Sequence, residues 1–165
     1  MKENLNLLEK NINDEIALYK ELESLYSKKQ EILTTKNIDE LTIVDSEILE
    51  NFDSIRSLVI NRNKIFSKIS SLPFNMSFLI EEAKKNDAKQ AERFAKQKDQ
   101  VNSLIKSLTQ LDLINMELTK FGIKVANKTM QIILNNVKVP TNEYNNQGKV
   151  VGQKKLQLSS VSEEV

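Results

Sequence analysis

Residues 87–137 read DAKQAERFAKQKDQVNSLIKSLTQLDLINMELTKFGIKVANKTMQIILNNV, and this stretch decides the fold. It contains no proline and one glycine, Gly122, among residues that favour helices. As a single helix of about 50 residues it would span roughly 75 Å. A typical helix of a globular protein has only about 12 residues. We therefore predict one long helix to which the rest of the chain must be fitted.

The apolar residues of this stretch follow two stripes. The first advances by alternating steps of three and four residues, which is the repeat of coiled coils and helical bundles. The second begins beyond Leu118 and is offset by about 200° around the helix, so the first half of the helix is apolar on one side and the second half on two. The first stripe consists of Val101, Leu104, Leu108, Leu111, Asn115, Leu118, Gly122, Val125, Thr129 and Ile132. The second consists of Phe121 or Ile123, Ala126, Met130, Ile133 and Val137.

The composition indicates one domain made of helices. Of the 165 residues, 39% are hydrophobic and 28% are charged, and three glycines and two prolines are too few for a fold rich in tight turns. We predict an all-α, coiled-coil-like antiparallel bundle of three long helices and one short helix. We expect residues 1–139 to form this bundle. Residues 140–165, with asparagine, glycine and serine among scattered charges, are expected to form a flexible, disordered C-terminal tail.

The residue types that are missing exclude most kinds of catalytic chemistry. The sequence has neither cysteine nor histidine, which removes disulfides, the usual zinc sites and the nucleophile–histidine pairs of hydrolases. Neighbouring carboxylates such as Glu81 and Glu82 alternate with lysines at helical positions and are interpreted as solvated faces, not as an acid–base pair. We expect no enzyme, no cofactor and no bound metal.

The charge and the N-terminal segment bear on partners and location. A net charge of +1 argues against a nucleic-acid binder, which would normally be clearly basic. The start of the chain, MKENL, lacks the apolar core of a signal peptide, and no run approaches the roughly 20 apolar residues of a membrane span. We expect a soluble, cytoplasmic protein with no membrane insertion.

Two further long helices are predicted before residue 87. They cover residues 2–33 and 38–70, and the short link between them favours an antiparallel hairpin. The charged residues of the first helix, Glu15 among them, are assigned to its solvated outer surface. Arg62 falls on the seam of the second helix, where its stem can pack while the guanidinium reaches out. The first seam consists of Leu5, Leu8, Ile12, Ile16, Tyr19, Leu22, Tyr26, Lys29 and Leu33. The second consists of Leu41, Val44, Ile48, Phe52, Ile55, Val59, Arg62, Phe66 and Ile69.

Polar residues mark where the helices begin. Asn37 precedes Glu40 with the spacing of a capping box, in which a side-chain oxygen accepts from a backbone N–H of the first turn. Asn75 is expected to cap the short helix, and Asp87, together with Gln90, the long last helix. These caps predict three helix starts.

Proline and polar residues predict the structure of the segment between the second helix and the last one. Pro73 ends the second helix, because the residue before a proline avoids helical geometry. A short helix is expected within residues 74–85. Residues 84–100 are mostly polar and are interpreted as a weakly packed, exposed arm of the last helix.

Three single residues attract separate interpretations. Asn115, on the apolar seam, is interpreted as a buried amide that fixes helix register, in preference to a ligand contact. Gly122, on the same seam, either permits a close helix approach or marks a bend, at a cost of about 1 kcal/mol relative to alanine. Tyr144 lies alone in a polar segment, where it either has no role or anchors a partner with its ring and hydroxyl.

Short motifs along residues 5–148 resemble those of one known family. They are EIxxYxxLxxL from Glu15 to Leu25 with Lys28-Lys29 after it, Leu41 and Val44 ahead of Glu47-Ile48-Leu49, Asn115-x-x-Leu118, and NEYNNQG from Asn142 to Gly148. Together they resemble the FlgN family of flagellar export chaperones. The Tyr-x-x-x-Gly element after a long helix is the most specific of them.

The resemblance implies a small helical cytoplasmic chaperone. Such chaperones bind the hook–filament junction proteins FlgK and FlgL through the C-terminal helices of those proteins, prevent premature assembly and bring them to the flagellar type III export gate. It further implies that Tyr144, followed by Gly148, docks to the gate. The alternative is a self-associating coiled-coil assembly protein without a secretion substrate, whose apolar stripe pairs with a second copy in a homodimer.

The lengths of the helices predict where a partner binds. The first two helices are each about 50 Å long, so the last helix, running back along them, exhausts their surface at about Lys120. The turns that follow would project past the loop at residues 34–37, and a monomer rarely exposes such an apolar patch without a use for it. A shift of the last helix, leaving residues 84–100 to project instead, is the alternative. The expected substrate-binding residues are Leu118, Phe121, Ile123, Val125, Met130, Ile132, Ile133 and Val137.

Overall fold

The computed structural model describes residues 2–35 and 37–136. These residues form the helices α1 (Lys2–Thr35), α2 (Ile38–Phe66), α3 (Met76–Lys84) and α4 (Ala88–Asn136). No strand occurs among the described residues, and the predicted all-α class is confirmed. The chain divides into two compact units, residues 1–120 and residues 121–165.

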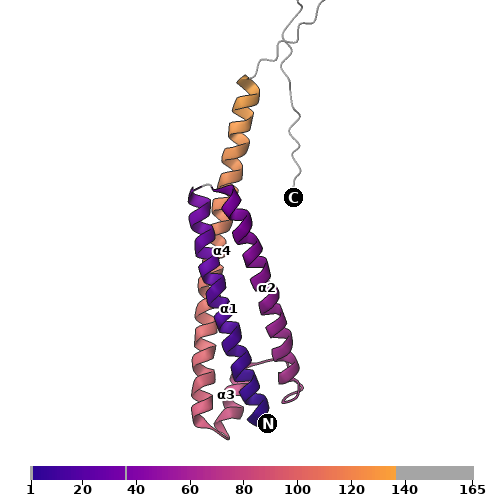
Figure 1. The fold of residues 1–165 in the computed structure, drawn as a ribbon. Coiled ribbons are helices and arrows are strands. Elements are labelled where there is room, and N and C mark those ends of the chain that lie inside the picture. The colour runs from indigo at the N-terminus through magenta and orange to yellow at the C-terminus, as the bar shows by residue number, and fades with distance from the viewer. Residues whose placement is uncertain (1, 36, 137–165) are drawn as a thin grey trace, which may run out of the picture. The chain divides into compact units, whose positions relative to one another are not determined.

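The first unit is an antiparallel helical bundle. α1 and α2 form a hairpin, and the part of α4 up to Lys120 returns alongside α1 and parallel to it (Figure 1). The short α3 lies near the N-terminal end of α1, between the end of α2 and the start of α4. The backbones of α1 and α2 approach each other most closely. This arrangement confirms the predicted bundle of three long helices and one short helix.

Polar side chains cap the helix starts where the sequence predicts them. Asn37 Oδ1 accepts a hydrogen bond from the backbone N–H of Glu40 at 3.5 Å. Asn75 Oδ1 accepts from the backbone N–H two residues later at 2.8 Å. Asp87 Oδ1 accepts from the backbone N–H of Gln90 at 3.2 Å. Each of these bonds satisfies one of the donors that the first turn of a helix leaves unpaired.

The C-terminal end of α2 differs from the prediction, because the helix ends at Phe66 and not at Ser70. The chain turns back so that the ring of Phe74 meets the ring of Phe66 edge to face, with centroids 5.3 Å apart. The guanidinium carbon of Arg62 lies 4.0 Å from the centroid of the Phe74 ring. The turn brings these aromatic and cation–π contacts together, and a straight helix to Ser70 would not.

The core consists of two clusters of buried apolar residues. The first lies at the end of the bundle that contains α3 and the second towards the link between α1 and α2. The first cluster comprises Leu5, Leu8, Ile12, Ile16, Ile65, Phe66, Leu79, Ala83, Ala91, Phe94 and Leu104. The second comprises Leu22, Ile32, Val44, Ile48, Ile55 and Leu108.

The predicted seam of α2 is wrong at Phe52. This ring is 43% exposed, and Asn51 takes the buried position between Ile48 and Ile55 with 6% of its surface exposed. Both residues satisfy a repeat of three and four, so the spacing alone does not choose between them. In the structure Asn51 takes this position, and its amide nitrogen donates hydrogen bonds to partners on α1.

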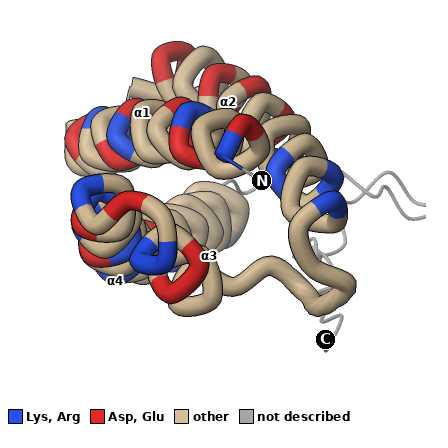
Figure 2. The backbone as a smooth tube through the Cα atoms, turned by 90° about the horizontal axis from the view of Figure 1, so that it is seen from below, with Lys and Arg blue, Asp and Glu red and all other residues tan. Residues whose placement is uncertain are grey.

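Charged residues of both signs are interspersed over the helices of the first unit (Figure 2). Two ion pairs join α1 to α2 at the surface, Lys29 to Asp45 at 2.7 Å and Lys28 to Glu47 at 3.6 Å. Exposed pairs of this kind contribute about 0–1 kcal/mol each. Most of the bundle's stability therefore comes from its apolar clusters and buried polar contacts.

Candidate functional site

The polar start of α4 packs against α1, and the prediction of an exposed arm at residues 84–100 is wrong. Gln90 and Gln97 are buried there, beside the buried Ala91 and Phe94. Their side-chain nitrogens donate hydrogen bonds across the interface, to Asn6 Oδ1 at 2.9 Å and to Asn13 Oδ1 at 2.8 Å. These hydrogen bonds replace those that the amide nitrogens would make to water, which lowers the cost of burying them. The sequence alone does not reveal these partners.

Glu9 of α1 ties this contact together. Gln90 Nε2 donates to Glu9 Oε2 at 3.0 Å, and Gln97 Nε2 donates to the Glu9 backbone carbonyl at 3.0 Å. The guanidinium of Arg93 forms a two-point ion pair with the Glu9 carboxylate. Burial by itself raises the pKa of Glu9, but the hydrogen bonds from Arg93 and Gln90 outweigh it and hold the pKa below its ordinary value. These contacts set the position of α4 along α1.

Asn115 forms a second such contact, near the end of the bundle. Its side chain is buried, and its Nδ2 donates to the backbone carbonyl of Tyr26 at 2.9 Å. This is the buried amide that the sequence predicts to fix helix register. Asn115 is the last buried residue described in α4: Leu118 is half-buried, and every residue from Thr119 to Leu134 is exposed.

Glu15 does not lie on the solvated outer surface, as predicted, but is buried with 1% of its surface exposed. Arg62 Nη1 donates to Glu15 Oε2 at 2.5 Å, so the guanidinium turns inward instead of reaching out to solvent. With its amide nitrogen oriented towards this carboxylate, Asn11 donates to Glu15 Oε1 at 2.9 Å. Burial raises the pKa of Glu15 above its ordinary value, and the charge of Arg62 offsets part of that rise. The paired cation and amide are what allow this carboxylate into the core.

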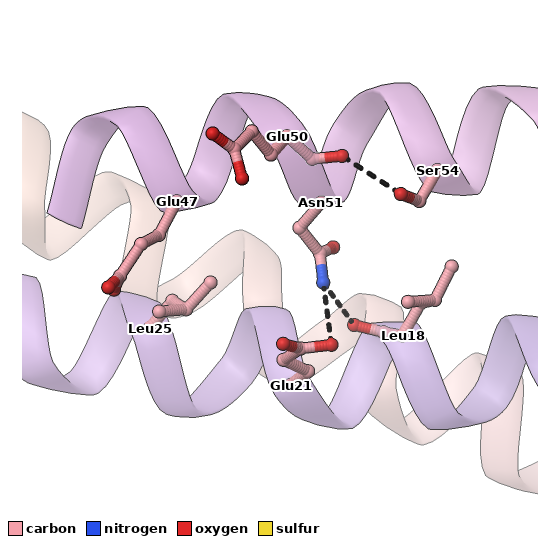
Figure 3. A pocket seen from close by; sticks show the side chains of 7 residues that line it. All are labelled: Leu18, Glu21, Leu25, Glu47, Glu50, Asn51 and Ser54. Atoms are coloured by element: carbon pink, nitrogen blue, oxygen red, sulfur yellow. Dashed lines mark hydrogen bonds between the residues drawn. The ribbon is translucent and has the colours of Figure 1, made fainter. Parts of the chain in front are cut away.

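A groove of about 390 Å³ lies between α1 and α2 (Figure 3). Asn51 lies between the two helices there, and its Nδ2 donates to the Leu18 carbonyl at 3.4 Å and to Glu21 Oε2 at 3.3 Å. The carboxylates of Glu47 and Glu50 line it and are exposed. No group of acidic residues among those described is arranged to hold a metal ion. The groove is thus a solvated acidic surface.

Six of the predicted substrate-binding residues lie on the second half of α4, within the second unit, and are exposed. Phe121 is 65% exposed, and the side chains of the other five are between 39% and 58% exposed. The five are Ile123, Val125, Met130, Ile132 and Ile133. Leu134, another apolar residue of the same turns, is also exposed.

The remaining predicted site residues have other placements. Leu118 belongs to the first unit and is half-buried. Val137, the predicted last substrate-binding residue, and Tyr144 and Gly148, the predicted gate-docking residues, lie outside the described residues.

Gly122 does not mark a close approach of helices. A methyl group built on its Cα meets no atom within 4 Å. α4 is also continuous from Ala88 to Asn136, so the helix runs unbroken through the glycine. The helix therefore tolerates Gly122, and no neighbour among the described residues comes close enough to require a residue without a side chain.

None of the described helices is long and apolar enough to cross a bilayer. The bundle and the exposed apolar helix define a class: an all-α helical bundle that carries an exposed apolar helix face. A model of one family, described as FlgN protein, matches residues 1–152. The chain therefore belongs to the FlgN family, which is a family of flagellar export chaperones and not of enzymes. No curated protein and no solved structure matches the chain.

Proposed function

We propose that this protein is a cytoplasmic chaperone of flagellar type III export that holds the hook–filament junction proteins FlgK and FlgL by their C-terminal helices. In this function it prevents premature assembly of its substrates and delivers them to the export gate. Family membership supports the general role. The exposed apolar face of α4 between Phe121 and Leu134 is the observation that supports a helix-binding site.

The chemistry of this face suits the capture of an amphipathic helix. Its exposed residues are large and apolar, and a fully buried side chain of the size of isoleucine or phenylalanine contributes about 1.5–3 kcal/mol. A substrate helix that lays its own apolar side on this face removes both surfaces from water. While the substrate is held in this way, its apolar helix is unavailable for assembly with neighbouring subunits.

The substitution Ile133→Asp tests the site. Ile133 is 52% exposed, so the free protein should keep its free energy of unfolding to within about 0.5 kcal/mol. A charge placed in an apolar interface has no partner, so capture of the FlgK or FlgL C-terminal segment should be lost. Isothermal titration calorimetry with those segments measures the loss, and urea denaturation measures the stability.

Gln131→Asp is the matched control, because Gln131 is also exposed and lies two residues away on the polar side of the helix. It should bind the segments as the natural protein does. If Ile133→Asp unfolds the free protein, or if both variants bind normally, the substrate site lies elsewhere.

The proposal extends to the residues after α4. We assign docking at the export gate to Tyr144, with Gly148 following it, by their match to the family's tyrosine and glycine motif. Tyr144→Ala should leave the melting temperature unchanged while it weakens binding to the cytoplasmic domain of the gate and reduces motility. Retained gate binding and motility would remove this role from Tyr144, and a lower melting temperature would make the residue structural.

Self-association is the second candidate function, because the same exposed face can pair with a second copy of the chain. Sedimentation velocity with and without the FlgK and FlgL segments separates the two. A chaperone is expected to form a complex that contains the segment. A homodimer that persists unchanged when the segment is added would favour the assembly protein.

A further inference from the structure

The second half of α4 is basic, although the chain as a whole is nearly neutral. The chain has 24 basic and 23 acidic residues. Between Phe121 and Asn136, however, α4 contains two lysines and neither aspartate nor glutamate. Lys124 and Lys128 belong to the second unit, and both are exposed. This local excess lies next to the apolar face assigned above.

The lysines border the apolar face on one side of the helix. At 100° per residue, Lys124, Asn127, Lys128 and Gln131 fall within a polar arc of about 100°. The large apolar residues, from Phe121 round to Leu134, spread over an arc of about 220° that also includes Gly122, Ala126 and Thr129. A helix on the surface of a bundle usually turns a stripe of roughly 100° towards its core. The apolar arc is therefore wide enough for two partner helices.

The charge arrangement carries a cost in the free protein. Lys124 and Lys128 are four residues apart, so they are neighbours on the helix and repel each other. No acidic residue of this half of α4 offsets the repulsion. A partner with carboxylates beside its apolar face would place opposite charges next to these lysines and remove that cost.

We propose that the face of α4 between Phe121 and Leu134 receives two amphipathic helices of a partner protein, and that the helix next to Lys124 and Lys128 carries acidic residues beside its apolar side. The inference rests on the proposed function. It says that acidic residues beside an apolar helix face select the substrate segment. The apolar arc supplies the contact area, and Lys124 and Lys128 supply the preference for acidic flanks.

Other occupants of the face fit less well. A second copy of the chain would bring the same lysines, and like charges oppose that pairing. Residues 137–165 contain four lysines and three glutamates, so the chain's own C-terminal segment lacks the acidic excess. A membrane surface attracts basic amphipathic helices, but a flat surface covers at most half of a helix's circumference and would leave part of the apolar arc in water.

Two designed helical peptides with the same leucine stripe test the proposal on the full chain, one flanked by glutamate and the other by lysine. The glutamate-flanked peptide should bind at least about fivefold more tightly at low salt, because several rim ion pairs add small favourable terms. The preference should shrink between about 50 mM and 500 mM NaCl, as screening predicts. Calorimetry should find two peptides per chain.

The double variant Lys124→Glu/Lys128→Glu should reverse the preference between the two peptides. Lys96→Glu/Lys106→Glu is the matched control, because both lysines are exposed on the first half of the same helix. This control should leave the preference unchanged. Equal binding of the two peptides, an equal effect of both double variants, or one peptide per chain would overturn the proposal.

Binding of another occupant would also overturn the proposal. One such result is tighter binding to phosphatidylglycerol vesicles, or to a peptide of residues 137–165, than to the glutamate-flanked peptide. Another is a homodimer that Ile133→Asp dissociates. The proposed function fails separately. If Ile133→Asp abolishes capture of the FlgK and FlgL segments but lysine reversal changes neither peptide's affinity, the chaperone function stands and the acidic preference falls.

Discussion

The two units of the molecule differ in which kinds of side chain are buried and which are exposed. In the first unit Glu15, Asn51, Gln97 and Asn115 are buried, although all four are polar. In the second unit large apolar side chains such as that of Phe121 are exposed. The buried polar residues and the exposed apolar residues both lie on long helices whose core positions recur every three or four residues. Residue type alone therefore does not decide what is buried in this protein.

The difference lies in which groups have found partners. Each of these four polar side chains makes at least one hydrogen bond or ion pair to another helix, and each such bond is directional. The bundle thereby gains a defined register in addition to apolar burial. The large apolar residues of the second unit remain exposed among the described residues. A protein partner is the proposed means of covering them.

The largest expected contrast is between two phenylalanines of the same helix. Phe94 is fully buried and Phe121 is 65% exposed. Phe94→Ala should cost about 3–5 kcal/mol, because it leaves a cavity in the first core cluster, and should lower the melting temperature by roughly 10 °C. Phe121→Ala should change the free energy of unfolding by less than about 0.5 kcal/mol. Thermal and urea denaturation measure both, and similar losses for the two variants would show that Phe121 is core.

The buried ion pair should give the next largest effect. Arg62→Met leaves the Glu15 carboxylate buried without its cation and should cost about 3 kcal/mol at pH 7. The loss should shrink as the pH falls. Burial raises the folded-state pKa of Glu15, and losing Arg62 removes the charge that offsets this rise. A raised folded-state pKa means that the fold binds this proton more tightly than the unfolded chain does, so the stability gained is fully present below the unfolded pKa and is lost as the pH rises through the folded pKa.

Urea denaturation from pH 4 to pH 7 measures this dependence. Arg56→Met is the control, because Arg56 lies exposed on the same helix and should show less than about 0.5 kcal/mol of change at either pH. A loss for Arg62→Met that stays constant with pH, or grows as the pH falls, would contradict the assigned role of Glu15.

The smallest of these effects concerns a buried amide. Gln97→Ala leaves the Glu9 carbonyl and Asn13 Oδ1 without their shared donor and should cost about 1–2 kcal/mol. Gln100→Ala, an exposed position one turn later, should stay within about 0.5 kcal/mol. Equal stability of the two variants would mean that the polar start of α4 is as weakly packed as its sequence suggests.

The regular features of the fold were predictable because they depend on nearby residues. The helix starts follow from Asn37, Asn75 and Asp87, whose side chains accept from backbone N–H groups within their own first turn. The end of α2 was harder, because Phe66 meets Phe74 across a turn and the contact depends on how the chain folds back. Helix caps can be predicted from a sequence because their partners lie within a few residues, whereas contacts across a turn are much harder to predict.

The candidate substrate site was predicted from helix length and periodicity together. The repeat of α4 predicted apolar residues on two sides beyond Leu118, and the side chains from Phe121 to Leu134 are exposed. The same reasoning misjudged residues 84–100 and Glu15, because helical spacing states which residues share a face and not what covers that face. A glutamine and a glutamate look solvated until their partners on another helix are known.

The all-α class, the helix starts, the buried position of Asn115 and the membership in the FlgN family were all predictable from the sequence. The folded bundle was needed to show that Asn51 replaces Phe52 in the interface, that Glu15 and Arg62 pair inside the bundle, and that the polar start of α4 is packed. The physical reason is that propensity, capping and periodicity act within a few turns of one helix. The cost of burying a polar group instead depends on donors and acceptors from distant parts of the chain, which meet only in the folded bundle.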